Sequence, residues 1–82
     1  MYFVYLIVSS KNNRIKSYVG YTNNLTKRIN DHNGGRGAKS TRGRKWKLIY
    51  KKKFQNRSKA MKYEYYLKKN YRLRNEIKKK YI

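Results

Sequence analysis

The chain has 82 residues, of which 24 are lysine or arginine and only 3 are aspartate or glutamate, so its formal net charge is +21. It contains no cysteine, which excludes a disulfide framework, a thiolate metal site and a cysteine nucleophile. Its length allows one small domain, which we place at residues 1–82. Charge of this density favours a polyanionic partner, nucleic acid before an anionic membrane surface. The aromatic content of 16% argues against a disordered basic tail.

An apolar segment rich in β-branched and aromatic residues, Tyr2–Val8, predicts a central strand that is covered on both faces. It has no basic region before it and no small-residue cleavage site after it, and it is too short to cross a bilayer. We therefore expect a cytoplasmic protein without a membrane partner. The polar residues Ser9–Arg14 predict a fairly long turn, and a second strand follows at about Lys16–Tyr21.

The next segment predicts a helix. Thr22–Asn24 supply possible N-caps, and Leu25, Ile29 and His32 repeat with the spacing of one helix face. The sequence Asn33-Gly34-Gly35 then ends the helix in the manner of a left-handed C-cap.

The rest of the chain predicts a loop, a strand and two more helices. Gly34–Lys45 is a cationic loop with several glycines. A third strand is predicted at Trp46–Phe54, where Trp46, Leu48 and Tyr50 share one face and alternate with Lys47, Ile49 and Lys51. Asn56 or Ser58 caps a helix that reaches about Lys69, and a last helix covers residues 72–82. The order β-β-α-β-α-α predicts an α+β fold in layers.

Several polar side chains lie where the fold alone does not require them. Two are strand tyrosines, two share a face of the first helix at i,i+4, and one is a carboxylate on a helix face that we expect to be buried. A buried carboxylate needs a partner, and a metal ion is one candidate. These residues are Tyr5, Tyr18, Arg28, His32 and Glu64.

Val4-Tyr5-Leu6 followed by Tyr18-Val19-Gly20 resembles a relaxed form of the paired motif that defines the GIY-YIG nuclease superfamily. The resemblance continues through Tyr21–Ile29, His32-Asn33, Gly37–Arg42 and Glu64, so it covers nearly the whole chain. It is strongest to the small stand-alone bacterial members. The chain departs from the motif at its first glycine, where it has Val4.

The resemblance implies a three-stranded antiparallel sheet flanked by helices, and Mg²⁺- or Mn²⁺-dependent hydrolysis of a DNA phosphodiester without a small-molecule cofactor. It implies that Tyr5 or Tyr18 helps to deprotonate the attacking water and that Arg28 meets the scissile phosphate. It further implies that His32 occupies a site position and that Glu64 binds the metal. Many relatives carry a late asparagine, for which this chain offers Asn75 or Glu76, and Asn70 earlier.

The residue types suit this chemistry. Phosphodiester hydrolysis needs an activated water and relief of negative charge on the phosphate. Magnesium keeps much of its hydration shell, so one carboxylate is enough to hold it. Arginine offers a forked pair of donors to phosphate oxygens, and a tyrosine becomes a better base near cations. Three cations of the loop, Lys39, Arg42 and Arg44, are candidates to position a DNA backbone.

Each residue taken singly also has an ordinary structural explanation, such as a strand aromatic, a solvated helix charge, or an ion pair of Glu64 with Lys68. Their joint occurrence favours a Mg²⁺-dependent DNA endonuclease. Branched or damaged DNA is among its candidate substrates. A non-catalytic nucleic-acid-binding protein on the same fold is the alternative. A ribosome-associated basic protein explains the charge but not the site, and a membrane-surface role is weakest.

Overall fold

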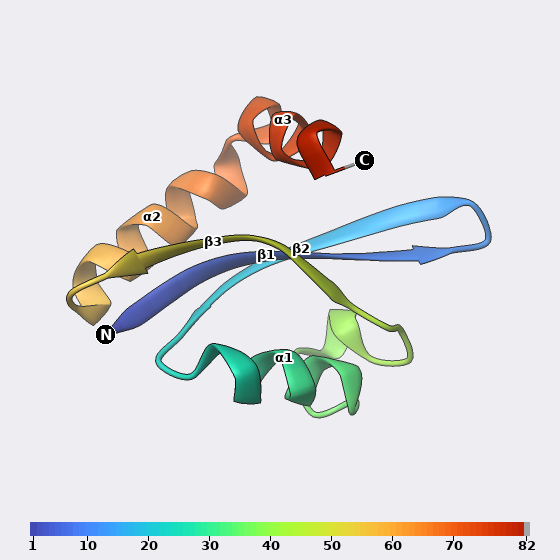
Figure 1. The fold of residues 1–82 in the computed structure, drawn as a ribbon, viewed down its shortest axis with the longest axis horizontal. Coiled ribbons are helices and arrows are strands. Elements are labelled where there is room, and N and C mark those ends of the chain that lie inside the picture. The colour runs from blue at the N-terminus through green and yellow to red at the C-terminus, as the bar shows by residue number, and fades with distance from the viewer. Residues whose placement is uncertain (82) are drawn as a thin grey trace.

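A three-stranded antiparallel sheet forms the middle layer of the molecule, with strand order β2-β1-β3 (Figure 1). The computed structural model describes residues 1–81. Their elements follow in the order β1 (Tyr2–Lys11), β2 (Arg14–Thr22), α1 (Leu25–Asn33), the short 3₁₀ helix η1 (Lys39–Thr41), β3 (Lys47–Phe54), α2 (Arg57–Lys69) and α3 (Tyr71–Tyr81). This arrangement confirms the predicted α+β fold and the element order β-β-α-β-α-α.

The central strand β1 is buried on both faces, as its unbroken apolar sequence predicts. Val4 and Leu6 point to one side, where they pack with Ala60 and Leu67 of α2. The alternate residues of β1 point to the opposite side, toward α1 and Trp46. In Figure 1 α1 lies below the sheet, and α2 and α3 lie above it. The sheet therefore separates two small cores, and the side of α1 contains the predicted tyrosine site.

The connection between β1 and β2 is a tight two-residue turn, so the prediction of a fairly long turn was wrong. β1 continues to Lys11, which pairs directly with Arg14. Asn12 and Asn13 between them have φ angles of 54° and 63°. Asparagine tolerates this left-handed region better than other side chains, and the tight hairpin turn needs it at both central positions.

The third strand departs from simple alternation. Its pairing with β1 shifts between Leu6 and Ile7, whose partners are Tyr50 and Leu48, so Ile49 is an extra residue in β3. Leu48 consequently packs on the side of α1, while Ile49 and Tyr50 pack on the side of α2. Alternation alone placed Leu48 and Tyr50 on the same face, which the bulge overturns.

Asparagine side chains begin all three helices. Asn24 accepts from the Lys27 N–H at 3.1 Å and Asn56 accepts from the Lys59 N–H at 2.9 Å, which selects one residue from each predicted set of caps. Asn70 does the same for α3. After the end of α1, the residue of the predicted Asn33-Gly34-Gly35 cap that takes the left-handed conformation is Gly35, with a φ of 79°. Within residues 1–81 there is no helix with the length and hydropathy needed to cross a membrane.

Candidate functional site

A buried hydrogen bond joins the first strand to the first helix at the candidate site. The hydroxyl of Tyr5 lies 2.8 Å from Nε2 of His32. Tyr5 is 1% exposed and His32 is fully buried. The ring of Tyr18, on the neighbouring strand, lies 5.0 Å from the His32 ring and 6.4 Å from the Tyr5 ring. Residues of β1, β2 and α1 therefore meet in one aromatic cluster.

Gly20 allows the Tyr5 ring to occupy this position. The two residues face each other in the pairing of β1 with β2. A Cβ atom on residue 20 would lie 2.4 Å from the Tyr5 hydroxyl oxygen and 2.6 Å from its Cζ. The glycine of the Tyr18-Val19-Gly20 motif is thus a packing requirement, because the phenol crosses the backbone of the partner strand.

Arg28 faces both tyrosines from α1, one turn before His32. Hydrogen bonding to Tyr5 raises the pKa of Arg28 above its usual value, and Tyr18 adds to this rise. Burial raises the pKa of Tyr5 to about 12, while the hydrogen bond and the charge of Arg28 oppose that rise. Tyr5 is therefore a neutral phenol at pH 7, held beside a permanent cation.

His32 is a neutral imidazole at the centre of the cluster. Its pKa is lowered below 6.5, first by burial and second by the charge of Arg28, and Asp31 only partly offsets these effects. A neutral histidine has one donor nitrogen and one acceptor nitrogen, so both ring atoms can take part in directed hydrogen bonds.

Thr41 is a buried partner of His32 that the sequence did not single out. Its hydroxyl lies 2.9 Å from Nδ1 of His32 and is itself fully buried in η1. The indole N–H of Trp46 donates to the Thr41 carbonyl at 2.8 Å. Gly37 packs against the same ring, since a Cβ there would lie 2.2 Å from Nδ1. No sequence pattern marked Thr41, because it lies in a loop that otherwise reads as exposed.

Glu64 lies on α2, in the helix layer on the side of the sheet opposite α1. Its Oε1 forms an ion pair with Lys68 at 3.3 Å and its side chain is 17% exposed. Its negative charge contributes to the raised pKa of Tyr5, so the two residues interact electrostatically. Among residues 1–81, no group of three or more His, Cys, Asp or Glu side chains is placed to hold a metal ion. A metal at Glu64 would therefore have fewer than three such side chains as ligands.

The protein-family model of the GIY-YIG catalytic domain matches residues 1–81 of this chain. The chain belongs to the GIY-YIG family. This is a nuclease family, and the match confirms the resemblance drawn from the motif residues.

Relatives within the GIY-YIG family carry the name UPF0213, which states no activity. A UPF0213 protein of Clostridium perfringens is 57% identical over 53 residues, covering 63% of this chain and 57% of that protein. UPF0213 protein YazA of Bacillus subtilis is 42% identical over 74 residues, covering 89% of this chain and 73% of YazA. The solution NMR structure of the UPF0213 protein BH0048 from Bacillus halodurans is similar, with 35% identity, a TM-score of 0.49, and coverage of 93% of this chain and 80% of that one. The match with the Clostridium protein spans less than two thirds of that relative's length.

The cationic loop of this GIY-YIG domain contains two exposed candidates for DNA contact and one cation with a different role. Lys39 and Arg42 are exposed. Arg44 is half-buried and donates to the Ser9 carbonyl at 3.3 Å, so it ties the loop to β1. Of the late residues left open by the sequence, Asn70 uses its side chain to cap α3 and to donate to Tyr66 at 3.0 Å. Asn75 is half-buried on α3.

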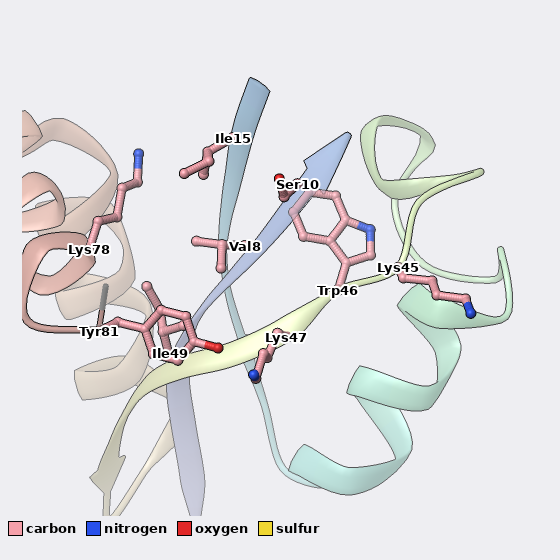
Figure 2. Close-up of a pocket in the computed structure, with 9 residues that line it drawn as sticks. All are labelled: Val8, Ser10, Ile15, Lys45, Trp46, Lys47, Ile49, Lys78 and Tyr81. Carbon is pink, nitrogen blue, oxygen red and sulfur yellow. The ribbon is translucent and has the colours of Figure 1, made fainter. Parts of the chain in front are cut away.

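Two hollows differ in chemistry. An apolar groove of about 470 Å³ lies between the β1–β2 hairpin, β3 and α3, and its floor includes Val8, Ile15 and Ile49 (Figure 2). None of the predicted site residues lines it. A smaller hollow of about 260 Å³ is lined by Arg28 and by the polar residues of the β2–α1 connection and the first turns of α1. The second hollow is connected with the tyrosine cluster through Arg28, which belongs to both.

Proposed function

We propose that this protein is a divalent-metal-dependent DNA endonuclease that acts in DNA repair, recombination or processing of incoming DNA. The observation that carries the proposal is the cluster at the family's motif positions, where Arg28 faces Tyr5 and Tyr18 while Tyr5 hydrogen-bonds to His32. A fold held together by apolar contacts alone would have no need for these polar groups at one place.

Arg28 is the proposed ligand of the scissile phosphate. It borders the polar hollow together with Lys27 and Asp31, which pair with each other at 3.1 Å, so a phosphate there would depend mainly on Arg28 for positive charge. Its guanidinium offers paired donors to two phosphate oxygens, and its charge opposes the negative charge that develops during cleavage. The contact with Tyr5 would keep the guanidinium oriented before DNA binds.

Tyr18 is the proposed contact for the attacking water. It is half-buried, whereas Tyr5 is 1% exposed and has a pKa raised to about 12. A phenol that is buried and already hydrogen-bonded to His32 is poorly placed to take a proton from water directly. We therefore assign Tyr5 and His32 to holding Arg28, and Tyr18 to the water.

Glu64 is the proposed metal ligand. Its ion pair with Lys68 uses Oε1, which leaves Oε2 for a cation. A single half-buried carboxylate fits Mg²⁺ or Mn²⁺, because these ions accept waters and phosphate oxygens as their remaining ligands. Such an ion would lower the pKa of a bound water and neutralise charge on the phosphate.

DNA binding is proposed to be largely electrostatic. The net charge of +21 favours contact with phosphates, and the exposed Lys39 and Arg42 lie on the loop that follows α1. A binder without catalysis would share this property. The retention of Glu64 in a chain with only 3 acidic residues argues for the enzyme, because removing that charge would strengthen binding to a polyanion.

The test is nicking of supercoiled plasmid and of branched DNA at low salt, with Mg²⁺, with Mn²⁺ and with EDTA. We expect metal-dependent cleavage that falls by about 100-fold or more in Arg28→Ala, because a preorganised donor to the transition state is lost. Arg72→Ala is the matched control, since it removes an exposed arginine of α3 and should leave cleavage unchanged. Tight binding without cleavage in either metal would overturn the enzyme and leave the nucleic-acid-binding alternative.

A further inference from the structure

The hydrogen bond of Tyr5 with His32 belongs to a longer series of buried hydrogen bonds. Tyr5 contacts Nε2 of His32 at 2.8 Å, and Nδ1 of the same ring contacts the Thr41 hydroxyl at 2.9 Å. The Thr41 hydroxyl also lies 2.8 Å from the Ala38 carbonyl oxygen. The three side chains are at most 1% exposed. Water therefore does not compete for these contacts.

The Ala38 carbonyl at the end of this series determines which group donates in each of its hydrogen bonds. A carbonyl oxygen only accepts, so the single hydroxyl proton of Thr41 must lie between Thr41 and Ala38. Thr41 then has only lone pairs for His32, and Nδ1 must carry the proton. Because a neutral imidazole has one N–H, Nε2 is left as the acceptor, and Tyr5 must donate to it.

The opposite direction is unfavourable. If Thr41 donated to Nδ1, its oxygen and the Ala38 carbonyl would face each other at 2.8 Å with no proton between them. Two oxygens that meet at this distance with only lone pairs repel each other, and the bond from the Thr41 hydroxyl to the carbonyl is lost. The loop geometry holds the two oxygens together, because the Thr41 N–H also donates to the Ala38 carbonyl at 3.0 Å.

We propose that Thr41 is a positioning residue that fixes His32 in the Nδ1-protonated tautomer and so directs the Tyr5 proton onto Nε2. The Tyr5 oxygen then presents only lone pairs to Arg28, which is a donor, and Arg28 is held ready for phosphate. With the other tautomer, Tyr5 would accept from His32 and its own proton would be free to point at Arg28. The value of this arrangement for cleavage rests on the proposed function, but the tautomer itself does not.

The tautomer can be measured directly, because His32 is the single histidine of the chain. Labelling histidine with ¹⁵N gives one imidazole, whose two nitrogens report which of them carries the proton. At pH 8, above the pKa of His32, we expect Nδ1 to be protonated in the wild type. We expect Thr41→Ser to keep this pattern, because serine supplies the same hydroxyl, and Thr41→Val to lose it at nearly the same side-chain volume. Thr26→Val, on the exposed side of α1, is the matched control and should resemble the wild type.

Cleavage gives the second readout. If the wild type cleaves DNA, Thr41→Val should lower kcat by roughly 10- to 100-fold with little change in KM, as for other residues that orient a ring nitrogen. Thr41→Ser should restore it. An Nε2-protonated wild type, or an unchanged tautomer in a folded Thr41→Val, would overturn the proposal. If Thr41→Val does not fold, the wild type and Thr41→Ser still decide. A wild type that shows the expected tautomer but never cleaves would count against the proposed function alone.

Discussion

Replacing Gly20 with alanine tests how Tyr5 is packed across the second strand. The new Cβ would lie 2.4 Å from the Tyr5 hydroxyl and 2.6 Å from Cζ, so the ring has to move. Overpacking of a core typically costs about 1–3 kcal/mol, and the buried hydrogen bond to His32 is worth about 1 kcal/mol. We expect Gly20→Ala to lower the free energy of unfolding by about 2–4 kcal/mol, which lowers Tm by roughly 10–25 °C in a domain of this size.

The assay is urea unfolding followed by circular dichroism, with a second glycine variant as the control. At Gly34 an added Cβ meets only the flexible tip of Arg36 at 3.0–3.2 Å, and φ is −88°. We expect Gly34→Ala to change stability by less than about 0.5 kcal/mol. A Gly20→Ala protein with the stability of the wild type would refute the packing of Tyr5 described above.

Further predictions concern pH and salt. The pKa of His32 is lower in the folded protein than in the unfolded chain, so the unfolded chain binds more protons below about pH 6.5. The contribution of neutral His32 to stability is therefore fully present above this pH and is lost as the pH falls. Urea unfolding between pH 7.5 and 5 should show this loss of stability, and His32→Gln should reduce it. Asp31, whose pKa is lowered by its hydrogen bond to Lys27, titrates below this window. In DNA binding measured against salt, Lys39→Ala and Arg42→Ala should each reduce the slope of log K by about 1, without loss of stability. Arg44→Ala should instead destabilise the fold, because its bond to the Ser9 carbonyl is lost.

The elements that carry strong local signals were predictable from the sequence. The apolar run of β1 indicated a strand buried on both faces, and the groups of possible caps that contain Asn24 and Asn56 marked the starts of two helices. The tight hairpin was not, because nothing in the polar segment Ser9–Arg14 shows that strand pairing continues to Lys11 and Arg14 and leaves only Asn12 and Asn13 for the turn. The bulge at Ile49 was also hidden, since it depends on pairing with β1 rather than on the sequence of β3.

The site residues also divide into those that the sequence marked and those whose role depends on tertiary contacts. Tyr5, Tyr18 and Arg28 were singled out mainly by the resemblance to the GIY-YIG motif, and the structure brings them together around His32. Thr41 was not found, because its role comes from a loop that folds back over the ring, and a threonine in a polar loop carries no pattern of its own. The metal role of Glu64 stays a prediction, since it depends on an ion that binds largely through water and substrate.

The most direct test of a metal-dependent nuclease is a comparison of Glu64→Gln with Lys68→Gln in plasmid cleavage and DNA binding. Glu64→Gln removes the carboxylate, whereas Lys68→Gln removes only its ion-pair partner at 3.3 Å. We predict that Glu64→Gln binds DNA at least as tightly as the wild type but no longer cleaves it in Mg²⁺ or Mn²⁺. Lys68→Gln should still cleave. Cleavage by Glu64→Gln at the wild-type rate would contradict the proposed site, and equal loss in both variants would show that the ion pair matters rather than the metal.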